Sequence, residues 1–98
     1  MIDSNDIIAT NTFKKLLKRK SRKAPKPLLD KIDDALLSLR KHPAPEFLGD
    51  PKKGPLAGLL GYKLDRENRI LYDVTRSGEK CTIRLLRVCS HKEVYGYD

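Results

Sequence analysis

The chain has 98 residues, of which 39% are hydrophobic and 35% charged, and its formal net charge is +8 at pH 7. That length supports one domain with one small core, so we expect residues 1–98 to form a single domain. The sequence contains no run of about 18 apolar residues and no signal-peptide pattern, which predicts a cytoplasmic protein that does not associate with membranes.

The positive charge is concentrated near the N-terminus. Residues 14–23, KKLLKRKSRK, contain seven Lys or Arg and no acid. These are Lys14, Lys15, Lys18, Arg19, Lys20, Arg22 and Lys23. Such a block on a folded domain indicates a polyanionic partner, either RNA or an acidic protein. The alternative is a solvated helix face that only keeps the protein soluble.

The first predicted elements are a strand over residues 6–11 and a helix that Thr12 can cap. Three apolar residues of this helix follow helical spacing, namely Phe13, Leu16 and Leu17. Pro25 and Pro27 end it.

A second helix is predicted to begin near Leu28. Its apolar stripe consists of Leu28, Leu29, Ile32, Ala35, Leu36 and Leu39. His42 lies at its end, where a histidine more often complements the last carbonyls than performs catalysis. Residues 43–55 contain four prolines and two glycines and therefore predict a loop, with Phe47 and Leu48 anchored on the core.

From residue 56 the apolar period becomes that of strands. Three strands are expected over residues 56–65, 69–75 and 80–89. The last is apolar on both faces, as expected for a central strand, and carries Cys81 and Cys89. These cysteines would lie about 27 Å apart and cannot form a disulfide, so we expect both to be small buried side chains.

The pattern as a whole predicts an α+β fold. An N-terminal strand and two helices precede a three-stranded antiparallel meander, and all strands form one twisted sheet with the helices on one face.

The register of the first hairpin decides which residues share a face. A three-residue loop over residues 66–68 would pair Asp65 with Arg69 and Lys63 with Leu71. Lys63, Asp65 and Arg69 would then share an open, basic face, which avoids burying an unpaired arginine. The apolar residues expected to face the helices are Tyr62, Leu64, Ile70, Tyr72 and Val74.

The order of elements resembles the RelE/ParE superfamily of toxins from type II toxin–antitoxin systems. The resemblance covers the whole chain and is carried by GPLAGLLGYKLDRENRILYDV (54–74) and LLRVCSHKEVY (85–95). It is most specific at Leu56 and Gly58, at the strand with Arg69 and Tyr72, and in the final segment.

The resemblance implies a RelE-like toxin, a ribosome-dependent mRNA endoribonuclease that inhibits translation. It implies three kinds of partner: a small acidic antitoxin, the ribosome with mRNA in its A site, and operator DNA only through the antitoxin complex. Two alternatives stay open. One is a ParE-like inhibitor of DNA gyrase, and the other is a homologue that only binds antitoxin or nucleic acid.

The resemblance also implies the site residues. Lys63, Arg69, His91 and Tyr95 match catalytic positions of RelE-type toxins. Asp65 stands where those toxins have a second lysine, and it could bind antitoxin, orient a base or pair with Arg69. Arg66 could supply the missing charge, and the auxiliary candidates are Asp65, Arg66 and Arg87.

These residue types suit RNA cleavage by attack of the ribose 2′-OH without a metal or another cofactor. Arg69 can grip two phosphate oxygens, and Lys63 adds a second positive contact. His91 has an ordinary pKa of about 6.5, so it can serve as base or acid. For Tyr95 we favour stacking on a base over proton transfer.

Overall fold

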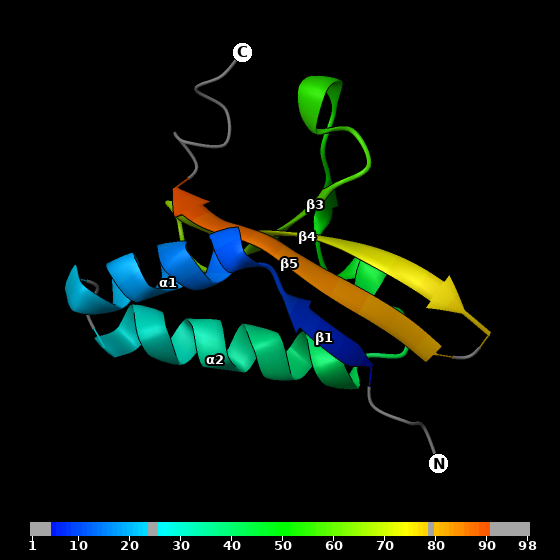
Figure 1. Ribbon diagram of the computed structural model, residues 1–98, viewed down its shortest axis with the longest axis horizontal. Coiled ribbons are helices and arrows are strands. Elements are labelled where there is room, and N and C mark those ends of the chain that lie inside the picture. The colour runs from blue at the N-terminus through cyan, green and yellow to red at the C-terminus, as the bar shows by residue number, and fades with distance from the viewer. Residues whose placement is uncertain (1–4, 24–25, 79, 91–98) are drawn as a thin grey trace.

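The computed structural model describes residues 5–23, 26–78 and 80–90 (Figure 1). The elements in chain order are β1 (Asp6–Ala9), α1 (Asn11–Lys23), α2 (Lys26–Lys41), the 3-10 turn η1 (Pro45–Phe47), β2 (Asp50–Pro51), the 3-10 turn η2 (Gly54–Leu56), β3 (Leu60–Lys63), β4 (Asn68–Ser77) and β5 (Lys80–Ser90). This order confirms the predicted α+β class.

The strands form one five-stranded sheet in the order β1-β5-β4-β3-β2. β1 runs parallel to β5, and all other pairs are antiparallel. The predicted meander is therefore β3-β4-β5. The sheet has one strand more than predicted, because Asp50 and Pro51 of the expected loop pair with Gly61 and Leu60. A proline is tolerated there because β2 is an edge strand.

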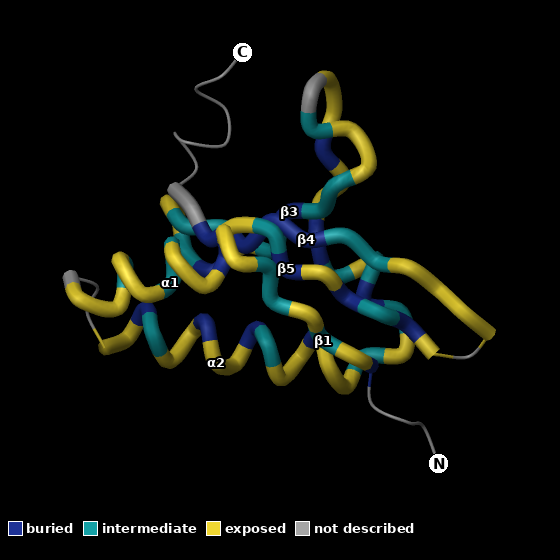
Figure 2. Tube along the Cα trace, viewed as in Figure 1, coloured by how far each residue is buried: buried dark blue, intermediate teal, exposed yellow. Residues whose placement is uncertain are grey.

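Both helices cover the same side of the sheet (Figure 1). The core between them is formed by Phe13, Leu28, Ile32, Ala35, Leu39, Leu64, Ile70, Tyr72, Ile83, Leu85 and Val88. Figure 2 shows this buried layer along α2 and the middle strands. The opposite side of the sheet, called the open face below, carries Asp50, Gly61, Lys63, Arg69, Leu71, Asp73, Arg84 and Arg87.

The start of α1 differs from the prediction by two residues. Thr10, not Thr12, caps the helix, because its hydroxyl accepts a hydrogen bond from the Phe13 N–H at 3.2 Å. The same hydroxyl donates to the Leu85 carbonyl of β5 at 2.8 Å. The cap is thus set by a contact with a distant strand.

The helix α2 begins at Lys26, two residues before the predicted start. Pro27 lies in its first turn, where the missing N–H costs no helical hydrogen bond. Pro25 lies outside the described residues. At the other end, the Asn5 side chain donates to the carbonyls of Leu39 at 2.8 Å and His42 at 2.7 Å. His42 Nδ1 accepts from the Ala44 N–H at 2.9 Å, so this histidine has a structural role.

Only one of the two predicted anchors of the loop 43–55 contacts the core. Leu48 packs against it, whereas Phe47 is 83% exposed, so the prediction for Phe47 is wrong. The reason is the 3-10 turn, in which residues three apart point the same way. Pro45 and Leu48 face inward, and Phe47 therefore points outward.

A β-bulge interrupts the pairing of β4 with β5. Leu71 pairs with Arg87 and Tyr72 with Leu85, which leaves Leu86 as the extra residue. Regular alternation after Leu85 would have buried Arg87 and exposed a valine. The bulge instead puts Arg87 on the open face, and Leu86 packs there against Leu71.

Cys81 and Cys89 both belong to β5, as predicted, and Cys81 is buried. The structure does not describe the side chain of Cys89. Within the described parts of the chain, neither helix is long and apolar enough to cross a membrane.

The Tyr72 hydroxyl donates a 2.8 Å hydrogen bond to the Pro45 carbonyl, which joins β4 to the loop 43–55. Burial raises the pKa of Tyr72, so the donor keeps its proton at neutral pH. We expect Tyr72→Phe to lower the free energy of unfolding by about 1–3 kcal/mol, because a buried carbonyl loses its partner. Urea denaturation measures this loss.

Tyr62→Phe is the matched control. Tyr62 also packs against the core, but among the described residues its hydroxyl makes no hydrogen bond. Equal losses in the two variants would contradict the assigned role of the Tyr72 hydroxyl.

Candidate functional site

The open face holds two rows of directly opposed residues near the β3–β4 turn. Lys63 on β3 stands opposite Arg69 on β4. The next row runs from Asp50 through Gly61 and Leu71 to Arg87. Directly opposed side chains share a face, with Cβ atoms about 5 Å apart.

The predicted hairpin register is wrong by two residues. Lys63 pairs with Arg69 instead of Leu71, and five residues instead of three separate the paired ends. An even shift leaves every side chain on its predicted face. The apolar set therefore faces the helices as expected, with Leu64, Ile70 and Tyr72 buried and Tyr62 and Val74 packed against the core.

Asp65 lies in the turn and organises it. Its Oδ1 accepts hydrogen bonds from the backbone N–H of Glu67 at 2.9 Å and of Asn68 at 2.7 Å, and from the Asn68 side chain at 3.1 Å. Partial burial raises the pKa of Asp65, but these hydrogen bonds outweigh it and the net pKa is lowered. The prediction that Asp65 pairs with Arg69 across the sheet is therefore wrong.

Arg69 is held by the same turn. Its Nη1 donates to the carbonyl oxygens of Asp65 at 2.6 Å and Asn68 at 3.1 Å. These contacts hold Nη1 of a half-buried guanidinium in place, so the planar group is oriented before any ligand binds.

Arg87 completes a cluster of three cations with Lys63 and Arg69. It lies diagonally across from Arg69, which corresponds to a spacing of about 7–8 Å. Lys63 and Arg87 are exposed. Leu71 lies between them and is 3% exposed, with Leu56 and Leu86 against it. The cluster therefore has an apolar floor and positive sides.

The other end of the open face is electrically balanced. Arg84 forms an ion pair with Asp73, its directly opposed neighbour, with Nε at 3.2 Å from Oδ2. Arg66 is exposed in the turn. Among the residues that the structure describes, Lys63, Arg69 and Arg87 form no ion pair, so the cations without an acidic partner lie toward the turn end of the face.

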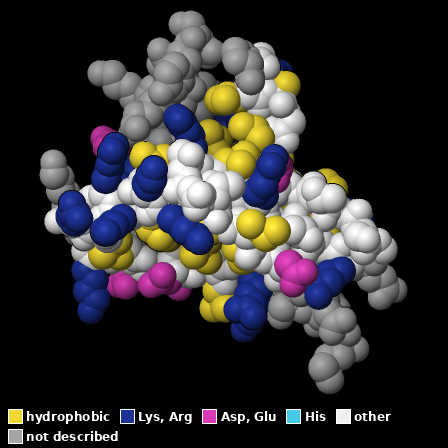
Figure 3. All heavy atoms as spheres, viewed as in Figure 1, with side chains coloured by type: hydrophobic (Ala, Val, Ile, Leu, Met, Phe, Trp, Pro, Cys, Tyr) yellow, Lys and Arg dark blue, Asp and Glu magenta, His cyan; other side chains and the backbone are white. Residues whose placement is uncertain are grey.

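The basic helix α1 contacts this turn directly. Lys20 Nζ donates to Asn68 Oδ1 at 3.3 Å, and Asn68 in turn contacts Asp65. The exposed basic residues of the predicted patch are Lys14, Lys15, Lys18, Arg19 and Arg22. Figure 3 shows Lys and Arg side chains gathered over α1. The side chain of Lys23 is not described.

Two predicted catalytic residues, His91 and Tyr95, lie outside the described residues. The sequence reasoning also did not foresee that Asp50 and the end of the Lys52 side chain lie on the open side of the sheet, beside Gly61. A strand of two residues shows no alternation, so the loop composition of residues 43–55 concealed them.

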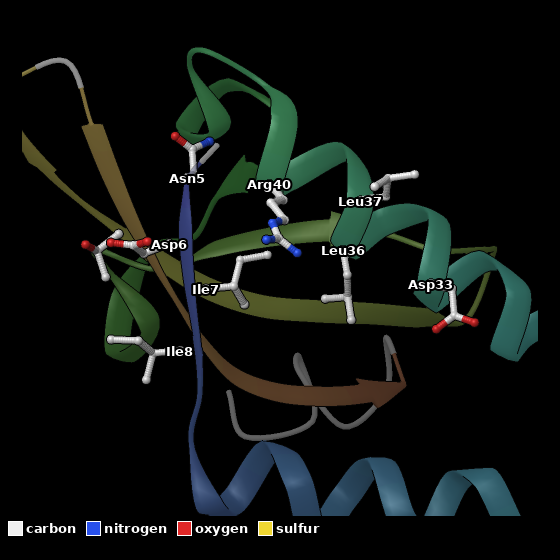
Figure 4. A pocket seen from close by; sticks show the side chains of 9 residues that line it. Asn5, Asp6, Ile7, Ile8, Asp33, Leu36, Leu37 and Arg40 are labelled. Atoms are coloured by element: carbon white, nitrogen blue, oxygen red, sulfur yellow. The ribbon is translucent and has the colours of Figure 1, made fainter. Parts of the chain in front are cut away.

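A separate groove of about 730 Å³ lies between β1 and α2 (Figure 4). It is lined by Asn5, Asp6, Ile7, Ile8, Asp33, Leu36, Leu37, Arg40 and Thr82. None of these belongs to the predicted site, so the groove is distinct from the cation cluster.

No family model and no curated protein matches the sequence. Solved structures do. A YoeB/ParE toxin from Agrobacterium tumefaciens has 23% identity and a TM-score of 0.70 over 88% of this chain and 98% of that one. YafQ from E. coli BL21(DE3) has 15% identity and a TM-score of 0.74 over 94% of this chain and 99% of that one. The E. coli DinJ–YafQ toxin–antitoxin complex has 18% identity and a TM-score of 0.71, and the match covers 94% of this chain and 98% of that one.

The chain has the RelE/ParE toxin fold. Because each similar structure covers most of both chains, the fold resemblance extends over helices and sheet alike. In this chain, Lys63 and Arg69 lie on the open face of the β3–β4 hairpin, and Arg87 lies beside them on β5.

Removing the Asp65 carboxylate tests its role in shaping the site. We expect Asp65→Ala to lower the free energy of unfolding at pH 7 by about 1–2 kcal/mol, because two backbone N–H groups lose their acceptor. The pKa of Asp65 is lowered on folding, so its stabilisation is present above the ordinary pKa of 3.8 and is lost as pH falls through the folded-state pKa. The difference between wild type and variant should therefore shrink in acid.

Chemical denaturation at neutral and acidic pH measures this difference. Glu67→Ala is the matched control in the same turn, since the Glu67 side chain is exposed, and it should change stability by no more than about 0.5 kcal/mol. A loss in Asp65→Ala that is the same at both pH values would contradict the role of the ionised carboxylate.

Proposed function

We propose that this chain is the toxin of a type II toxin–antitoxin system and that it cleaves mRNA in the ribosomal A site. The observation that carries the proposal is the Lys63–Arg69 cross-strand pair with Arg87 diagonal to it, on a sheet face that the helices leave uncovered. Three cations at this spacing suit the closely spaced phosphates of a bound RNA strand.

The reaction is cleavage by attack of the ribose 2′-OH on the adjacent phosphorus. Negative charge develops on the phosphate oxygens in the transition state, and preoriented cations stabilise it. Arg69 carries this role in the proposal, because its guanidinium is fixed through Nη1 and can still present donors to phosphate oxygens. Lys63 and Arg87 add positive charge on either side.

Proton transfer is assigned to residues that follow β5 in the chain. His91 is joined to Ser90, the last residue of β5, which pairs with Asn68 at the turn end of the sheet. A histidine with an ordinary pKa of about 6.5 can act as base or acid at neutral pH. In the proposal Tyr95 stacks on a base of the message.

The proposed partners follow from the charge of α1. Its exposed lysines and arginines suit ribosomal RNA phosphates and also an acidic antitoxin. A toxin of the same fold has been solved together with its antitoxin, as DinJ–YafQ. Operator DNA would be bound only through the antitoxin complex, and the proposed location is the cytoplasm.

We expect Arg69→Ala to reduce cleavage of ribosome-bound mRNA by about 100-fold or more, because the main stabiliser of the transition-state charge is lost. Primer extension on programmed ribosomes with purified protein measures the cut. Arg84→Ala is the matched control, since it removes the same charge from the paired, distant end of the open face.

Cleavage that survives in Arg69→Ala, Lys63→Ala and Arg87→Ala alike would contradict the site. Gyrase-dependent DNA breaks with intact mRNA would instead identify a ParE-like inhibitor.

A further inference from the structure

The groove between β1 and α2 gathers exposed apolar side chains. Among the described residues three large hydrophobic side chains are exposed, and two of them, Ile8 at 53% and Leu37 at 51%, line this groove. Ile7 and Leu36 add to the apolar lining. On one side of the groove lies β1, an edge strand of the five-stranded sheet. Apolar side chains exposed together at one groove indicate an interaction surface.

The α2 side of the groove has a regular order of side chains. Asp33, Leu36, Leu37 and Arg40 follow at i, i+3, i+4 and i+7, which puts two leucines between opposite charges on one side of the helix. Figure 4 shows the Leu36 and Arg40 side chains directed toward β1. Asp33 and Arg40 are exposed, and within the described ranges neither side chain forms an ion pair.

This order is complementary to itself. Consider two antiparallel copies of α2 related by a two-fold axis between Leu36 and Leu37. Asp33 and Arg40 are seven residues apart, about 10 Å along the helix, so each lies about 5 Å from the axis. Asp33 of either copy therefore stands opposite Arg40 of the other, and the leucines meet at the centre. An apolar centre with charged residues at its edge is the usual arrangement of a protein interface.

We infer that this groove is a homodimer interface, in which a second copy of the chain packs its α2 antiparallel to α2, seats its Leu37 in the groove and pairs its Arg40 with Asp33. The groove's other carboxylate, Asp6, is already paired with Lys80 at 3.5 Å, so it does not compete for Arg40. No groove residue belongs to the cation cluster or to α1. The inference therefore does not rest on the proposed function.

The first test measures self-association by sedimentation equilibrium at about 0.15 M salt, which screens the net charge of +8. We expect the apparent mass to rise with concentration from 11.2 kDa toward twice that value. Leu37→Ser should raise the dimer Kd by about 10-fold or more, because the two-fold axis makes the loss of buried leucine occur twice. Phe47→Ser is the matched control, since Phe47 is 83% exposed and does not line the groove, and it should leave the Kd unchanged.

The second test exchanges the charges. Asp33→Arg and Arg40→Asp each put like charges opposite one another in a homodimer, so each variant alone should stay monomeric where wild type dimerises. The two variants mixed in equal amounts should form a heterodimer, because both positions of one copy then carry arginine and both positions of the other carry aspartate. Asp34→Arg changes a neighbouring exposed carboxylate that does not line the groove, and it should dimerise like wild type. All these positions are exposed, so far-UV circular dichroism should match that of wild type.

Four results would overturn the inference. The first is a wild-type chain that sediments as a monomer even at about 1 mM, where a weak complex still forms. The second is a dimer that persists in Leu37→Ser and in both charge reversals, since it would use another surface. The third is an equal mixture of the two charge-reversal variants that stays monomeric. The fourth is a monomeric wild type whose antitoxin binding is lost in Leu37→Ser, since the groove would then belong to a different protein.

Discussion

The carboxylate of Asp65 closes the turn on which the open face depends. By accepting two backbone N–H groups and the Asn68 side chain, it sets where β3 ends and β4 begins. That choice puts Lys63 opposite Arg69. The turn then holds Arg69 through its own carbonyl oxygens, and Lys20 of α1 reaches it through Asn68. One side chain thus links the sheet register, the orientation of the central arginine and the position of the basic helix.

Two local irregularities shape the rest of the face. The extra residue in β5 turns Arg87 outward and lets Val88 enter the core, which avoids burying a guanidinium. Gly61 leaves a gap that the end of Lys52 occupies. Both features depart from regular strand geometry, and each determines which side chain lies beside Leu71 on the open face. The chemistry of the face therefore depends on where the sheet is irregular as much as on its alternation.

Much of the architecture could be predicted from the sequence because it follows from the spacing at which apolar residues recur. Apolar spacing identified both helices, and period-two alternation assigned Lys63 and Arg69 to one face even though the register was wrong, since the error was even. The errors arose where a contact between residues far apart in the sequence determines the local structure. Thr10 caps α1 because it also bonds to β5, and Lys52 is on the open face because β2 pairs with β3. Neither contact leaves a local signal.

The chemistry proposed for this face makes its own prediction about the cut message. Attack by the ribose 2′-OH, with Arg69 stabilising the phosphorane and no metal, leaves a 2′,3′-cyclic phosphate on the upstream fragment and a free 5′-OH on the downstream one. The most direct test of the account is analysis of these ends after purified protein meets programmed ribosomes. The account predicts downstream fragments that polynucleotide kinase labels without prior phosphatase treatment. Fragments with a 5′-phosphate and a 3′-OH, or a message that stays intact, would contradict it.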